Sequence, residues 1–260
     1  MKQAPVGTVK DIYRYPVKSM AGERIPETKV EAYGLYGDRC YAFTDRTKQG
    51  WSRYITAREV PELLSYRARL ADHSESETGM DAAVPQVVIS APDGRLLEWE
   101  EELLRTIPGL QGRHADMETF VPGSDPSSDL PGLLAVDSAG VLLITEPSLR
   151  KLESLWGNEA DIRRFRPNIV ISLDADVPFA EKNWIGSRLI VGNAVFQADL
   201  LCERCSMIGL DPDTLERNST LLRTVVAELD GCFGLYASVL ASGSLRVGDT
   251  LYIAEAENRV

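Results

Sequence analysis

The stretch LIVGNAVFQA, residues 189–198, predicts two short β-strands joined by a tight turn. Gly192 and Asn193 tolerate the backbone angles of a two-residue hairpin turn, and apolar side chains flank them on both sides. Comparable short apolar runs, separated by turn residues, occupy residues 7–13, 41–44, 86–89, 96–100, 168–172 and 251–253. The chain is therefore expected to be rich in short strands.

Helical patterns are few. Residues 58–64 and 101–106 predict short helices, and residues 146–156 and 220–229 predict longer ones. A parallel α/β sheet needs long helices in regular alternation with strands, and this pattern is missing. The sequence thus predicts a mainly β fold with some α, built on a barrel-like sheet with added helices.

Composition and net charge exclude some classes of function. The chain has 260 residues, 39 acidic and 28 basic, and a formal net charge of -11. Such a charge argues against a general nucleic-acid binder or a protein that adheres to anionic membranes. The hydrophobic content of 44% is that of a globular protein of one or two domains. With no membrane-length apolar run and no apolar leader, we expect no membrane span and a cytoplasmic protein.

Two stretches predict loops. Residues 71–84 are acidic without an apolar period, and residues 122–132 are rich in proline, serine, aspartate and glycine. The second stretch is the candidate linker or surface crossing.

The segment Cys202-Glu203-Arg204-Cys205 has the spacing of a metal or redox pair. A structural zinc site needs four ligands, and the only other cysteines are Cys40 and Cys232, neither of which has a close partner in sequence. A thioredoxin-like pair would lie near a βαβ pattern, which the sequence does not display. Two packed thiols, or a single thiolate ligand to a soft metal with Arg204 favouring the thiolate, remain open.

Basic side chains are concentrated at three other places. Residues 15–22 end a predicted strand at a proline turn that offers Lys18 and Ser19, either as an anion site or as a solvated turn. Residues 34–39 predict a glycine turn whose Arg39 can bind a phosphate or a carboxylate, or pair with Asp38 at the surface.

The third place, residues 163–170, sets three arginines before a buried strand. Pro167 disfavours helix at Arg166 and predicts an extended backbone there. Asn168 can both donate and accept hydrogen bonds. A solvated strand end is the alternative to an anion site.

Taken together, these segments resemble MOSC-domain proteins, the family named after the C-terminal domain of molybdenum cofactor sulfurase. The resemblance runs in order through residues 9–19, 37–39, 56–58, 166–168, 202–205, 210–214, 233–236 and 247–249. The sequence is similar to the mitochondrial amidoxime-reducing component and its bacterial counterparts, which carry an N-terminal β-barrel domain. The resemblance implies a MOSC N-terminal β-barrel domain over residues 1–111 and a MOSC domain over residues 112–254.

The resemblance implies a molybdenum cofactor (molybdopterin) and an enzyme that reduces small N-hydroxylated compounds. Electrons would come from a separate electron-transfer protein, since the chain has no C-x4-C-x2-C ferredoxin run. The alternative is a sulfur carrier, or a protein that hands the cofactor on, without reductase activity. A non-catalytic binding domain is the third hypothesis.

The same resemblance assigns roles to residues. Cys205 matches the molybdenum ligand and, with Asp137, is the candidate catalytic residue. The implied cofactor contacts are Lys18, Ser19 and Arg39 at the phosphate end, then Ser138, Arg166, Asn168, Glu203, Arg204 and Tyr236. The chain departs from the family pattern at Ala139, which replaces a hydroxyl, and at Glu203, which replaces a small polar residue. An acidic protein is thus expected to enclose a small cationic site.

Overall fold

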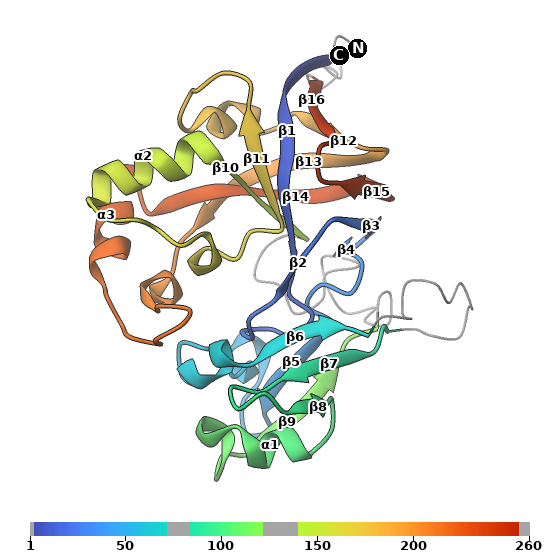
Figure 1. Cartoon of the computed structure of the whole chain (residues 1–260), viewed down its shortest axis with the longest axis vertical. Helices are drawn as coiled ribbons and strands as arrows, with labels where there is room; N and C mark the ends of the chain where they lie inside the picture. Colours follow the sequence, from blue (N-terminus) through green and yellow to red (C-terminus); the bar gives the residue numbers. More distant parts are fainter. Residues whose placement is uncertain (1–2, 72–83, 122–139, 255–260) are drawn as a thin grey trace.

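The computed structural model describes residues 3–71, 84–121 and 140–254. Its larger part is a sheet of eight strands, shown in the upper half of Figure 1. The strands are β1 (Gln3–Arg14), β2 (Glu23–Ile25), β10 (Val141–Thr145), β11 (Ile169–Leu173), β12 (Arg188–Val191), β13 (Ala194–Glu203), β14 (Cys232–Ala241) and β16 (Thr250–Ala254). Their order is β11-β10-β14-β13-β12-β16-β1-β2, and β1 also pairs with β11. Seven of these strands therefore close into a barrel.

The hairpin predicted at residues 189–198 is confirmed as β12 and β13. Val191 pairs with Ala194 across the turn, and Gly192 has a φ of 59°, which favours glycine. Alternate residues of β13 such as Phe196 and Ala198 are buried in the barrel interior. Half-buried alternation of this kind is what allows a sheet to close around an apolar core.

One side of the barrel is covered by helices. Helix α2 (Glu146–Trp156) connects β10 to β11, which run parallel, and α3 (Thr220–Leu229) packs beside it (Figure 1). Both helices were predicted at these bounds. The βαβ unit was not, because β10 runs into α2 without an intervening turn residue, so its strand pattern has no boundary.

Below the barrel in Figure 1 lies a smaller lobe made of strands β5 to β9 and helix α1. Its elements are β5 (Tyr41–Asp45), β6 (Arg67–Leu70), β7 (Val87–Ser90), β8 (Leu96–Glu98), β9 (Ala115–Thr119), α1 (Glu102–Thr106) and the 3-10 turns η1 (Gly50–Arg53), η2 (Pro61–Ser65) and η3 (Pro108–Leu110). They enclose a separate apolar core that includes Phe43, Leu63 and Ile89.

Three short strands and three 3-10 turns complete the described chain. Strands β3 (Glu27–Glu31), β4 (Gly34–Leu35) and β15 (Gly243–Arg246) form a small sheet of their own. The turns are η4 (Ile162–Arg164), η5 (Ala180–Trp184) and η6 (Ser206–Gly209).

Two predicted elements differ from the structure. The helix expected at residues 58–64 is instead the 3-10 turn η2, which begins at Pro61 because proline favours the first position of a helical turn. The strand expected at residues 96–100 ends at Glu98. The predicted domain boundary at residues 111 and 112 stays a prediction; β1 belongs to the barrel sheet, and β9 pairs with β5.

No helix in the described ranges has the length and apolar character needed to cross a membrane.

A buried carboxyl group lies beneath the start of α2. Glu181 of η5 accepts hydrogen bonds from the hydroxyls of Thr145 at 3.1 Å and Ser148 at 2.9 Å. Burial raises the pKa of Glu181 above its ordinary value, and these hydrogen bonds only partly offset it.

Glu181→Gln is expected to stabilise the protein increasingly as pH rises. The folded state holds the Glu181 proton more tightly than the unfolded state. Wild-type stability from this group is therefore fully present below the unfolded pKa and declines as pH rises through the folded pKa. The side-chain amide oxygen of the variant would still accept hydrogen bonds from Thr145 and Ser148, but the amide carries no negative charge. Thermal melts of both proteins from pH 4 to pH 8 (a range set by the ordinary pKa near 4.3) measure the difference, and a constant difference across that range would contradict the prediction.

Candidate functional site

A pocket lies where the barrel strands approach the smaller lobe, and it encloses about 800 Å³ of space, its open mouth included. It is lined by Lys18, Ser19, Arg39, Thr56, Arg58, Leu142, Arg164, Phe165, Arg166, Asn168, Cys202, Glu203, Arg204, Cys205, Met207 and Tyr236. The structure thus brings together nine residues proposed from sequence: Lys18, Ser19, Arg39, Arg166, Asn168, Glu203, Arg204, Cys205 and Tyr236. Their roles stay predictions. Asp137, Ser138 and Ala139 lie outside the described residues.

Lys18 enters the pocket from the turn that follows β1. Its backbone N–H donates to Tyr41 O at 2.8 Å, which ties this turn to β5. The side chain is 8% exposed, and its Nζ lies 5.2 Å from the ring centre of Tyr54 and 5.8 Å from that of Trp51. These ring faces stabilise an ammonium that is largely removed from water.

Arg39 is held by its neighbour Asp38 and by the segment at residues 166–168. Its guanidinium pairs with Asp38 and donates to Asn168 Oδ1 at 3.2 Å and to Arg166 O at 3.3 Å. Burial alone would lower the pKa of Arg39, but the carboxylate of Asp38 outweighs burial and raises the pKa. The Asp38–Arg39 pair predicted as a surface alternative therefore exists, but it is buried at the pocket.

Asn168 positions Arg39 rather than standing free. Its Oδ1 also accepts from Leu142 N at 3.0 Å, and its Nδ2 donates to Tyr13 O at 3.3 Å. One side chain thus links β10, β1 and Arg39, which explains why a polar group is tolerated at 1% exposure.

The ring of Tyr15 contacts two of the pocket arginines. Its ring centre lies 4.1 Å from the guanidinium carbon of Arg166 and 5.0 Å from that of Arg39. A Cβ at Gly22 would stand 2.5 Å from Cδ1 of Tyr15 and 2.2 Å from Arg14 O, so only glycine leaves room for this ring. The aromatic face lets two positive groups approach the same pocket at reduced cost.

The backbone of the site is strained. Ser19, Arg39 and Arg166 have φ values of 70°, 52° and 53°, and they are three of the six non-glycine residues with positive φ in the described ranges. The extended backbone predicted at Arg166 is therefore wrong. The chain reverses there after η4, and the guanidinium donates to Met20 O at 2.5 Å. Strain of this kind concentrates at functional sites, because the surrounding fold must hold it.

The CxxC segment follows β13. Cys202 is buried and accepts a hydrogen bond from Arg204 Nη1 at 2.9 Å, while Arg204 Nη2 donates to Phe165 O at 2.9 Å. Cys205 is exposed and is the residue directly before η6. The guanidinium of Arg204 thus contacts the sulfur of Cys202 and not, as expected from the sequence, the thiolate of the ligand cysteine.

All four cysteines are free thiols, and no three His, Cys, Asp or Glu side chains gather into a metal-binding group among the residues that the structure describes. The structure therefore gives no support to the zinc alternative within these ranges. Cys40 lies buried in the core of the smaller lobe, where burial raises the pKa of its thiol to about 12. Of the four, Cys205 offers the most accessible sulfur.

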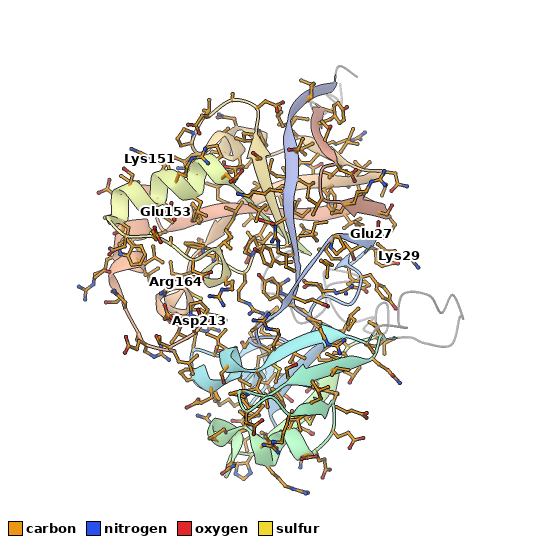
Figure 2. The ribbon with its side chains drawn as sticks, in the orientation of Figure 1. Glu27, Lys29, Lys151, Glu153, Arg164 and Asp213 are labelled. Carbon is orange, nitrogen blue, oxygen red and sulfur yellow. The ribbon has the colours of Figure 1, made fainter. Side chains whose placement is uncertain are left out.

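Sequence reasoning missed further pocket residues, among them Thr56, Arg58 and Arg164. Arg164 donates to a carboxylate oxygen of Asp211 at 2.5 Å. Figure 2 shows Arg164 below helix α2. The sequence did single out residues 56–58 and the cluster of three arginines. Neither pattern indicates which of these side chains point into the pocket.

The donor set fits an anionic group. Six cationic side chains line the pocket (Lys18, Arg39, Arg58, Arg164, Arg166 and Arg204) against one carboxylate, Glu203. The buried Nε atoms of Arg164 and Arg204 have no hydrogen-bond partner among the described residues. Buried N–H groups without a partner cost free energy, so an acceptor bound in the pocket would be stabilised by them.

Comparison with known families agrees with this architecture. The MOSC domain matches residues 132–252, and the MOSC N-terminal beta barrel domain matches residues 6–101. The chain is a MOSC-domain protein. The mainly β fold expected from the resemblance is confirmed by the closed barrel and these matches.

Curated proteins also align with this chain. The MOSC protein is 28% identical to mitochondrial amidoxime reducing component 2 of Bos taurus, over 95% of this chain and 83% of that protein. It is 38% identical to molybdenum cofactor sulfurase of Danio rerio, over 40% of this chain and 13% of that protein. A solved structure of the YuaD protein from Bacillus subtilis aligns at 11% identity with a TM-score of 0.49, over 98% of this chain and 99% of that one.

Proposed function

We propose that this MOSC protein is an oxidoreductase that binds a molybdenum cofactor and reduces small N-hydroxylated compounds. The observation that carries the proposal is the exposed sulfur of Cys205 at a pocket lined by six cationic side chains. The relatives named as amidoxime reducing components support the substrate class.

The residues of the pocket divide into those that would hold the cofactor and those that hold other residues. Lys18, Ser19 and Arg39 would bind the phosphate, and Arg166 and Arg204 would face the remaining anionic groups, since guanidinium matches such acceptors. Cys205 would ligate molybdenum through its thiolate. Asn168 and Tyr15 act through Arg39 and are positioning residues.

The chemistry balances as a two-electron reduction. An N–OH group takes up two electrons and two protons, its N–O bond breaks, and N–H and water are produced. When bound, the molybdenum and its dithiolene supply the redox chemistry. The protein binds and orients the reactants and keeps the cofactor's charges matched inside a largely buried pocket.

The electrons require a donor, which we propose to be a separate electron-transfer protein. The net charge of -11 favours a donor with a basic patch. Association between such surfaces slows steeply as salt increases, because ions screen the attraction.

The second candidate function is a carrier that passes the cofactor on, or one whose Cys205 thiol takes the outer sulfur of a donor persulfide and leaves the donor as a thiol. The exposed thiol favours it, and relatives named molybdenum cofactor sulfurase match part of the chain. A carrier would show a persulfide mass on Cys205 without reducing N-hydroxylated compounds.

The decisive experiment uses protein made in a molybdenum-sufficient host. We expect about one molybdenum per chain, since the pocket would hold one cofactor, and reduction of benzamidoxime to benzamidine with reduced methyl viologen. The same protein from a host unable to make the cofactor is the control. Molybdenum bound without any turnover would reject the reductase and leave the carrier.

A further inference from the structure

A second hollow continues the pocket outward. It shares seven lining residues with the pocket, namely Lys18, Thr56, Arg58, Glu203, Arg204, Cys205 and Tyr236. It adds Trp51, Tyr54 and Leu200. Cys205 therefore lies where the inner, cationic space meets an outer space with large apolar side chains. We call this second space the outer hollow.

The outer hollow has an aromatic wall. The rings of Trp51 and Tyr54 lie 5.4 Å apart, and Tyr54 packs in turn against Phe120 at 6.0 Å. Lys18 contacts both rings of the wall, which fixes them beside the pocket. Trp51 is nonetheless 61% exposed. A large aromatic side chain that is held in place but left in water offers a flat apolar face to a ligand.

The barrel contributes Leu200, which is 46% exposed and lies opposite Tyr236 in the register of β13 and β14. Aromatic and aliphatic side chains from two parts of the fold thus line one space. They add apolar surface to a space whose other lining residues are mostly polar or charged.

Among the residues that the structure describes, Glu203 is the one acidic side chain that lines this space, beside the cations Lys18, Arg58 and Arg204. Lys18 and Arg204 would be matched by the anionic groups of the proposed cofactor, which leaves Glu203 facing the ligand. Within the described ranges its carboxylate has no hydrogen bond or ion pair, although it lines both hollows. It lies across from Cys232 on β14, and its charge adds to burial in raising the pKa of that thiol. A carboxylate is a poor contact for an anionic cofactor, because like charges repel. It suits a ligand that brings N–H donors or a positive charge.

We propose that the outer hollow is the substrate site and that Glu203 sets its charge selectivity. A planar ring lies against Trp51 and Tyr54, and a planar head with forked N–H donors, neutral or cationic, binds Glu203 beside Cys205. Anionic compounds of the same shape are rejected. The inference rests on the proposed function for the reaction, but the binding preference is measurable without turnover.

The test compares benzamidinium with benzoate, two planar probes of similar shape and opposite charge. Calorimetry on the protein from a molybdenum-sufficient host measures the dissociation constant of each. We expect benzamidinium to bind more tightly, and Glu203→Gln to weaken it about tenfold while leaving benzoate unchanged or tighter. Trp51→Ala is expected to weaken benzamidinium severalfold through the lost ring contact, with no change in its charge preference.

Matched controls separate these effects from general surface changes. Glu228→Gln removes an exposed carboxylate on α3, and Leu96→Ala removes an exposed apolar side chain on β8. Both are expected to bind benzamidinium as the wild type does. A preference for benzoate, or benzamidinium binding that is unchanged in Glu203→Gln, would overturn the inference.

The outcomes distinguish the inference from the proposed function. If benzamidinium binding depends on Glu203 and Trp51 but no N-hydroxylated compound is reduced, the selectivity stands and the reductase is rejected. If benzamidoxime is reduced and Glu203→Gln changes neither its KM nor benzamidinium binding, the reductase stands and the role of Glu203 is wrong.

Discussion

Cys205→Ser is expected to lower benzamidoxime reduction to the background rate, a loss of roughly 100-fold or more. The hydroxyl of serine is a weak ligand for a metal that prefers thiolate. Because Cys205 is exposed at the pocket and has no structural contact through its sulfur among the described residues, the fold is expected to be unchanged. The measurements are turnover, molybdenum content and the visible absorption of a thiolate–molybdenum bond.

Cys232→Ser is the matched control for this change. Cys232 is a half-buried free thiol on β14 that does not line the pocket, so its loss should leave turnover and the visible spectrum intact. Cys202 is unsuitable as a control, because its sulfur accepts the hydrogen bond from Arg204. Equal turnover and equal spectra in Cys205→Ser and wild type would exclude Cys205 as the ligand.

Asn168→Ala is expected to destabilise the protein by about 2–4 kcal/mol, since it leaves several buried polar groups without partners. Leu142 N and Tyr13 O would each lose a hydrogen bond, and Arg39 would lose its link to the residue that precedes β11. Urea denaturation measures the change in the free energy of unfolding. Bound cofactor should also fall, because Arg39 would no longer be held toward the phosphate.

Asn193→Ala provides the comparison at an exposed site. The Oδ1 of Asn193 accepts from Ser244 N at 2.5 Å in an exposed turn, where water can replace it. Its cost should stay near 1 kcal/mol or below. Similar losses in both variants would show that the interstrand bonds of Asn168 carry no special weight.

The fold was largely predictable where strands end in clear turns. The hairpin around Gly192 and the helix at Thr220–Leu229 were found because apolar periodicity and turn residues coincide there. Strand β14 was not predicted, although it pairs with both β10 and β13. Its sequence mixes glycine, serine and cysteine with apolar residues, so the apolar residues follow neither the spacing of a helix nor that of a strand.

The site was predictable as a set of residue types but not as a geometry. The resemblance located Arg39 and Arg166, yet nothing in the sequence shows that both guanidinium groups contact the ring of Tyr15. The left-handed backbone at Arg166 runs against the local preference before proline, because the surrounding fold decides it. Tertiary contacts of this kind cannot be derived from local patterns.

The pairing that closes the barrel has a consequence for the order in which the chain folds. Strand β1 pairs with β16, and Gln3 lies opposite Ala254, so the ring closes only after residue 254 has been synthesised. Contacts so distant in sequence form slowly, because a long loop must be closed first. The smaller lobe, whose core is built from residues 17 to 115, can fold earlier. Binding of the proposed cofactor would then be the last step of maturation, because Lys18 and Arg39 share their pocket with Arg166 and Arg204, which lie far along the chain.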